Sequence, residues 1–119
     1  MTRDPNCVFC KIVAGEIPAK KVYEDDLVVA FHDINPRTPV HILIVPKAHI
    51  VSANEATEAH RDALGQLFLA ARQVAESTGV AKTGYRLLVN NGPHAGQEVM
   101  HLHMHLFGGR PLGPMVMPS

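Results

Sequence analysis

Three histidines at two-residue spacing, His101, His103 and His105, carry the clearest chemical potential in this chain. Imidazole is a nucleophile, a proton carrier and a metal ligand near neutral pH. Successive side chains of a β-strand point to opposite faces, so this spacing predicts a strand with all three rings on one face. The apolar residues between and after them would pack against the other face (Leu102, Met104 and Leu106).

Strand geometry also limits what the three rings can do together. Side chains two residues apart are separated by roughly 6.5–7 Å, and those four apart by roughly 13 Å. One phosphate-sized group can contact two neighbouring imidazoles but hardly all three. The spacing therefore predicts that the histidines divide between two tasks.

Two cysteines at i, i+3 spacing, Cys7 and Cys10, suggest one of those tasks. Together with His49 and His101 they would complete a tetrahedral zinc site of the structural type. His103 and His105 would then remain for chemistry. A Cys-x-x-Cys pair also fits a redox-active dithiol or two inert core thiols, and the sequence leaves these alternatives open.

The other task would suit phosphorus chemistry. A nucleophilic imidazole attacks phosphorus, and the resulting phosphorus–nitrogen intermediate can be hydrolysed in a second step. The loop at 90–99 contains two glycines, and its backbone N–H groups could bind phosphate oxygens. His41 lies in the most apolar run of the chain; a lone histidine there is usually a core residue, but strand pairing would favour a functional role.

The elements that must position these residues fit one α+β domain spanning residues 1–119. We expect strands at 21–24, 27–32, 40–45, 85–90 and 101–107, with a tight turn at 25–26. The run at 40–45 is apolar throughout, as in a central strand buried on both faces. A short helix is expected at 7–14, and a long one is capped by Ser52 or Thr57 and ends at Gly79. The apolar stripe of the long helix is Leu64, Leu67, Phe68, Ala71, Val74 and Ala75.

The charge and the hydropathy of the chain limit the classes of partner that we expect it to bind. The formal net charge is zero, which gives no support to binding of nucleic acid or an anionic membrane surface. The N-terminal residues are polar, and no stretch reaches the length of a transmembrane helix. We therefore expect a cytoplasmic protein.

The His-x-His-x-His run followed by two apolar residues resembles the signature of the histidine triad (HIT) family of nucleotide hydrolases and transferases. Further segments resemble its branch of small nucleotide-binding proteins and cover nearly the whole chain in order. These segments are 31–34 (FHDI), 38–41 (TPVH), 46–49 (PKAH), 90–92 (NNG), 96–97 (GQ) and 108–115 (GGRPLGPM).

The resemblance implies a five-stranded antiparallel sheet with one long and one short helix, and a homodimer with a continuous ten-stranded sheet. It implies hydrolysis of purine nucleoside 5′-phosphoramidates to a nucleoside monophosphate and an amine, through a nucleotidyl-histidine intermediate. The alternatives are a dinucleoside polyphosphate hydrolase and a non-enzymatic nucleotide-binding regulator. A nucleotidyl transferase fits less well, because that branch carries Gln where His105 stands.

The resemblance also implies roles for individual residues. His103 would be the nucleophile, with His105 and His41 contacting the phosphate, and Asp33 would bind the ribose hydroxyls. Structural zinc would be held by Cys7, Cys10, His49 and His101. The nucleotide would further contact base-side residues (Phe9, Ile12, Phe31, His32 and Ile34) and phosphate-side residues (Asn90, Gly96, Gln97 and Val99). Glu98 stands where the branch often has a serine beside the leaving group, and the C-terminal tail lacks tryptophan.

Overall fold

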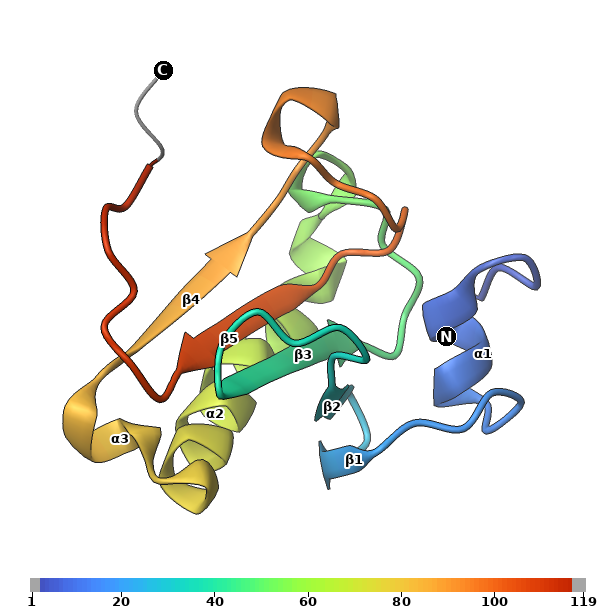
Figure 1. The fold of residues 1–119 in the computed structure, drawn as a ribbon. Helices are drawn as coiled ribbons and strands as arrows, with labels where there is room; N and C mark the ends of the chain where they lie inside the picture. Colours follow the sequence, from blue (N-terminus) through green and yellow to red (C-terminus); the bar gives the residue numbers. More distant parts are fainter. Residues whose placement is uncertain (1–2, 117–119) are drawn as a thin grey trace.

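The computed structural model describes residues 3–116 and shows a five-stranded antiparallel sheet with the order β1-β2-β3-β5-β4 (Figure 1). This confirms the expected α+β fold class. The strands are β1 (Lys21–Glu24), β2 (Val28–His32), β3 (Val40–Pro46), β4 (Tyr85–Val89) and β5 (Met104–Gly108). The helices are α1 (Val8–Val13), α2 (Arg61–Thr78) and α3 (Val80–Thr83), with 3-10 turns η1 (Ala53–Glu55), η2 (Glu58–His60) and η3 (Pro93–Ala95).

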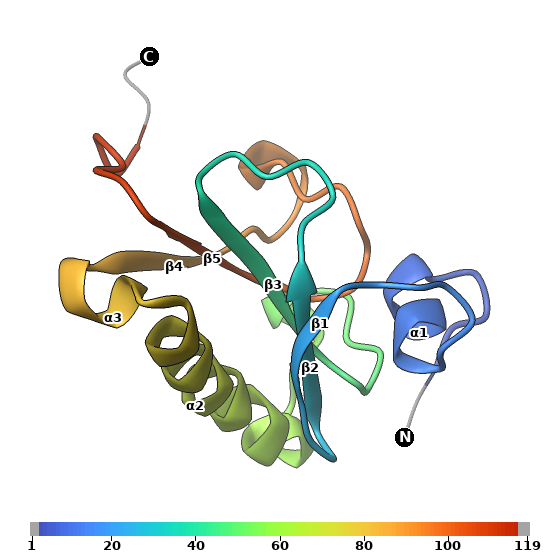
Figure 2. The ribbon, with the colours of Figure 1, turned by 60° about the horizontal axis from the view of Figure 1, so that its bottom comes forward.

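The long helix α2 and the short helix α1 lie on opposite sides of the sheet, as Figure 2 shows. Alternating strand residues therefore enter two different apolar clusters. The α2 side holds the larger core, which includes Val28, Ile42 and Leu106. The α1 side holds a smaller cluster in which Phe9 and Phe31 pack with their rings edge to face. The histidines of interest face the α1 side.

The strand β3 forms the centre of the sheet, between β2 and β5. Its residues from His41 to Pro46 are all buried, which confirms the strand predicted from its continuous apolar run. Antiparallel pairing with β5 aligns His41 with Phe107 and Leu43 with His105. The two histidines therefore lie on one face at diagonal positions of adjacent strands.

The prediction of a strand from residue 101 is wrong at its start, because β5 begins only at Met104. His101 and His103 lie in the segment before it, where Leu102 N–H donates to the Ile50 carbonyl at 2.6 Å. The residues of this segment still alternate between the two faces of the sheet, although they form no ladder of strand pairing. Leu102 joins the α2 core together with Met104, while His101 and His103 contact Phe9 on the α1 side.

The helical region also differs from expectation in three places. Ser52 and Thr57 cap the 3-10 turns η1 and η2, and α2 itself starts at Arg61. Phe68, expected in the buried stripe, is 61% exposed, because the buried face of α2 is formed mainly by alanines with Leu67 and Val74. The additional helix α3 begins directly after Gly79, whose φ of 84° ends α2 in a left-handed turn.

Candidate active site and metal centre

His41 and His105 form a direct contact across the β3–β5 pair. Their Nε2 and Nδ1 atoms are 3.0 Å apart, and the Asp33 carboxylate lies 3.5 Å from the same His41 nitrogen. Asp33 is held there because its own N–H donates to the His41 carbonyl just beyond the end of β2. Strand pairing thus builds a cluster of two imidazoles and one carboxylate.

Backbone chemistry determines where the protons of this pair reside. The Arg37 N–H, which can only donate, lies 3.2 Å from His41 Nδ1, so this nitrogen carries a lone pair. In neutral His41 the proton is therefore on Nε2, from which it is donated to His105 Nδ1. Because neutral His105 accepts this bond on Nδ1, its own proton is on Nε2, the nitrogen that is not bonded to His41.

His103 has the opposite tautomer. Its Nδ1 lies 2.7 Å from the backbone carbonyl of His101, which can only accept, so Nδ1 carries the proton. The lone pair of neutral His103 is then on Nε2, as a nucleophile requires. The rings of His103 and His105 are 5.0 Å apart between centroids. The Nε2 atom of His103 thus has a lone pair, and the Nε2 atom of the neighbouring His105 has an N–H.

Burial keeps the histidine pair uncharged. It lowers the pKa of His105 to about 4, assisted by the nearby His103 and His41 and opposed by Asp33. Burial likewise lowers the pKa of His41, with Asp33 again acting in the opposite direction. Near pH 7 the unliganded protein therefore holds both rings neutral, with Asp33 as a nearby anion that favours their protonation.

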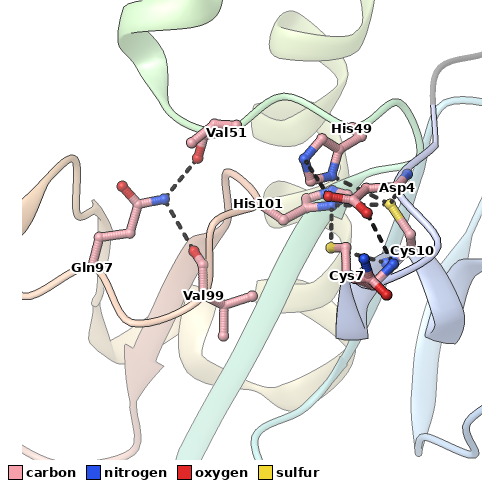
Figure 3. A network of polar contacts seen from close by, with 9 residues as sticks. Asp4, Cys7, Cys10, His49, Val51, Gln97, Val99 and His101 are labelled. Atoms are coloured by element: carbon pink, nitrogen blue, oxygen red, sulfur yellow. Dashed lines mark hydrogen bonds and ion pairs between the residues drawn. The ribbon is translucent and has the colours of Figure 1, made fainter.

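Four thiol and imidazole groups converge beside α1, as Figure 3 shows. Cys7 Sγ lies 3.3 Å from His101 Nδ1, and Cys10 Sγ lies 3.6 Å from the same atom and 3.4 Å from His49 Nδ1. The four ligand atoms are all within 4.8 Å of one another. Two sulfurs and two nitrogens at this separation suit a tetrahedral metal ion of the zinc type.

The surroundings of these groups favour metal ligation. His101 Nε2–H donates to the Pro46 carbonyl at 2.8 Å, so the Nδ1 lone pair is directed at the thiols. Backbone N–H groups of Cys10 and Asp4 each lie 3.4 Å from a cysteine sulfur. The Asp4 carboxylate is 3.9 Å from His49 Nε2. Burial raises the pKa of the Cys10 thiol, whereas a bound cation would favour its thiolate.

A second cluster of potential ligands, Asp33, His41 and His105, is less suited to a metal. The Arg37 N–H occupies the Nδ1 lone pair of His41, so His41 Nε2 is protonated in the neutral ring. A cation there would require His41 to lose that proton. The tautomers therefore distinguish a proton-carrying cluster from a metal-binding one.

Gln97, one of the predicted phosphate-side residues, holds the loop before the histidines in place through its side chain. Gln97 Nε2 donates to the carbonyls of Val51 and Val99 at 2.7 and 3.0 Å (Figure 3), and its Oε1 accepts from Gly92 N–H at 2.9 Å. Its amide is thus committed to the main chain. Asn90 and Val99 are half-buried, whereas Gly96 and Glu98 are exposed.

The predicted base-side residues differ in exposure. Phe9, Ile12 and Phe31 are buried in the smaller core, with little surface left for a ligand. His32 is exposed, and Ile34 is 92% exposed beside Asp33. Ile34 is therefore the apolar member of this set that is open to a base.

Sequence reasoning missed the groups that set the tautomers, namely the Arg37 amide and the carbonyls of His101 and Pro46. These are main-chain atoms, which every residue has, so residue types gave no signal for them. A groove of about 630 Å³ lined by 83–86 and 109–112 contains none of the histidines and lies toward the far end of β5.

Comparisons with known proteins agree with this architecture. The sequence model of the HIT domain family matches residues 14–112. The purine nucleoside phosphoramidase of Escherichia coli K12 is 52% identical over 109 residues, which are 92% of this chain and 92% of that protein. A HIT-like protein of Azospirillum brasilense is 51% identical over 119 residues, with 97% and 95% covered.

Solved structures give the same picture. A HIT family hydrolase from Clostridium thermocellum superimposes with a TM-score of 0.92 at 49% identity, covering 96% of this chain and 99% of that one. A histidine triad protein from Clostridium difficile also gives a TM-score of 0.92, at 42% identity, with 97% and 100% covered.

Proposed function

This chain belongs to the HIT domain family, and on that premise we propose that it hydrolyses purine nucleoside 5′-phosphoramidates to a nucleoside monophosphate and an amine. The observation that carries the proposal is the pair of opposite tautomers at His103 and His105. One ring has a free lone pair on Nε2 and its neighbour has an N–H on Nε2. A displacement at phosphorus needs both a nucleophile and a proton donor.

In the proposed reaction, His103 Nε2 attacks phosphorus and the phosphorus–nitrogen bond to the amine breaks. The nucleotidyl group makes His103 cationic, and the His101 carbonyl that accepts from Nδ1–H stabilises that charge. His105 gives a proton from Nε2 to the departing nitrogen. Water then attacks the intermediate, gives its proton to His105, and releases the nucleoside monophosphate and free His103.

When the substrate binds, the histidine pair takes up from solvent the proton that the amine receives. A bound phosphate anion next to His105 favours the protonated ring, in addition to the existing effect of Asp33. We infer that the His41–His105 pair takes up a proton when the nucleotide binds. The pair is therefore neutral when empty and becomes an acid when occupied.

The nucleotide-binding assignments follow the same proposal. Asp33 would accept from ribose hydroxyls, Ile34 and His32 would contact the base from the exposed side, and the loop held by Gln97 would place backbone N–H groups near the phosphate. Glu98 is exposed and lies between Gln97 and Val99 of this loop. We assign it no role in the reaction.

A panel of three substrates tests this function: an adenosine phosphoramidate, a guanosine phosphoramidate and a dinucleoside polyphosphate, each with wild type and His103→Ala. The proposal expects rapid release of amine from a phosphoramidate by the wild type alone. Preferred cleavage of the dinucleoside polyphosphate would identify the enzyme as a polyphosphate hydrolase. Nucleotide binding without turnover of any substrate would identify a non-enzymatic regulator.

We further infer that Zn²⁺ is held by Cys7, Cys10, His49 and His101, as the convergence of their ligand atoms supports. Four protein ligands leave no position for substrate, so the ion would be structural. It would connect α1 to the segment that follows β3 and to the segment that precedes β5. Metal analysis of protein purified without chelator tests the identity of the ion.

We also propose a homodimer in which two β4 strands pair to form a ten-stranded sheet. β4 is an edge strand that pairs only with β5 on one side, and exposed strand edges readily pair with another chain. Light scattering after size exclusion would distinguish a dimer from a monomer. We also propose a cytoplasmic location, because in that compartment a cysteine pair more often binds metal than forms a disulfide. Among residues 3–116, none of the helices combines the length and the apolar character that a membrane span requires.

A further inference from the structure

The C-terminal segment after β5 contacts the loop that orients His41. Arg110 Nη2 donates to the Arg37 carbonyl at 3.2 Å. Gly109 approaches Pro39 so closely that an added Cβ would lie 2.8 Å from Pro39 Cβ, and its φ of 95° already favours glycine. Two consecutive residues of this segment therefore contact the loop between β2 and β3.

The loop between β2 and β3 has few backbone N–H donors. Pro36 and Pro39 have no N–H and restrict the backbone on both sides of Arg37 and Thr38. The Arg37 N–H reaches His41 Nδ1 at 3.2 Å. The N–H of Arg37 thus donates to His41, and the carbonyl of the same residue, which lies in the next peptide unit, accepts the bond from Arg110.

The direction of the Arg37 amide determines the proton positions of two rings. While the amide donates to His41 Nδ1, the proton of His41 remains on Nε2 and faces His105 Nδ1. If the amide moved away, His41 could carry its proton on Nδ1 and present a lone pair to His105. His105 would then have to donate from Nδ1, and its Nε2 would lose the proton.

We propose that Gly109 and Arg110 are positioning residues that hold the Arg37 amide against His41 and thereby keep the His105 proton on the Nε2 that faces the substrate. The contacts themselves are independent of the reaction. The kinetic consequence rests on the proposed function: because the Arg37 amide occupies His41 Nδ1, the proton taken up when the nucleotide binds is directed to His105, which gives a proton from Nε2 to the amine.

The chain offers matched control variants. Arg86 of β4 donates to the carbonyls of Gly113 and Pro114, so Arg86→Ala removes a guanidinium that binds the same C-terminal segment but not the Arg37 carbonyl. Gly113 has a φ of 78° and nothing within 4 Å of an added Cβ, so Gly113→Ala introduces left-handed strain without the Pro39 contact. Arg110→Ala and Gly109→Ala are the corresponding test variants.

The experiment measures histidine tautomers in the ligand-free, ¹⁵N-labelled protein at pH 7 by long-range ¹H–¹⁵N correlation. In the wild type we expect His41 and His105 protonated on Nε2 and His103 on Nδ1. In Arg110→Ala and Gly109→Ala we expect the His41 and His105 nitrogen shifts to move toward mixed tautomers, with His103 unchanged. Arg86→Ala and Gly113→Ala should retain the wild-type pattern.

Turnover provides a second readout. The test variants should lose kcat by about fivefold, the factor that corresponds to one hydrogen bond, with KM nearly constant. The loss should grow with the basicity of the departing amine. Wild-type tautomers in both test variants, or equal changes in the controls, would overturn the proposal. Shifted tautomers in a protein that cleaves no phosphoramidate would leave the positioning role intact and refute the proposed function.

Discussion

The His103 ring hydrogen-bonds to the carbonyl of His101 at 2.7 Å, while the His101 ring lies 3.3 Å from the Cys7 sulfur. One residue therefore contributes its side chain to the candidate metal centre and its main chain to the candidate nucleophile. The two sites differ in their chemistry, and the single residue His101 connects them.

Replacing the nucleophile tests the proposed reaction most directly. His103→Ala removes the Nε2 lone pair, so turnover of an adenosine phosphoramidate should fall on the order of 10³-fold or more. Binding of adenosine monophosphate should persist, because the variant retains His41, Asp33 and His105. Single-turnover kinetics and calorimetric titration measure the two quantities. Comparable turnover in wild type and variant would refute the assignment.

Proton uptake on binding is the second expectation. A bound phosphate raises the pKa of His105 from about 4, so the site takes up protons at pH values between the pKa of the free and the occupied protein. Titration calorimetry of adenosine monophosphate at pH 6, in buffers of different ionisation enthalpy, measures the number of protons taken up. His105→Gln should reduce that number, and equal uptake by both proteins would contradict the expectation.

Acid stability should depend on the same residue. The folded pKa of His105 is about 4 and its ordinary value is 6.5, so as pH falls through this window the unfolded chain binds a proton that the folded protein does not. Stability is therefore lost from pH 6.5 down to 4, by up to about 1.4 kcal/mol per pH unit for this residue. Urea unfolding of wild type and His105→Gln should give curves that converge toward low pH. Parallel curves would exclude this contribution.

The metal centre should contribute to stability more than to chemistry. Cys7→Ser removes one ligand, and we expect bound zinc to decrease and the Tm to fall by roughly 10 °C, equivalent to about 2 kcal/mol for a domain of this size. A chelator should lower the Tm of the wild type but not that of the variant. Turnover should change less than either. An unchanged Tm and metal content would argue for inert core thiols.

The approach of β5 to α3 provides a test of packing. A Cβ added to Gly108 would lie 2.8 Å from Val80 Cγ1, so Gly108→Ala should cost about 1–3 kcal/mol through overpacking. Val80→Ala removes the opposing methyl groups, and the double variant should lose less stability than the sum of the two single changes. Chemical denaturation of the four proteins measures the coupling. Additive losses would show that the contact relaxes without cost.

The sequence predicted the fold well where buried side chains recur at a regular spacing along the chain. The apolar run of β3 identified the central strand, and the alternation around Leu102 and Met104 identified which side chains face α2. Phe68 was wrongly placed in the core, because helical periodicity marks a stripe but does not show how far the covering sheet extends. The start of β5 was also misplaced, because His101 and His103 alternate without pairing in a ladder.

The sequence predicted which residues form the site, but not which nitrogen of each imidazole carries the proton. The division of the three histidines followed from strand spacing and agrees with the contacts of His101 and His105. The tautomers follow from the Arg37 amide and from the carbonyls of His101 and Pro46. A sequence contains these main-chain groups at every position, and only the folded backbone selects three of them.

The candidate metal centre also bears on how the protein is made. Cys7 and His101 are separated by 94 positions, so the cluster closes a loop that includes most of the chain. At about 5–20 residues per second, a ribosome adds His101 roughly 5–20 s after Cys7. His49 is added earlier, 39 positions after Cys10, so three of the four ligand groups are present before His101 completes the set. The candidate metal centre can therefore be completed only after β1 to β4 and α2 have been synthesised.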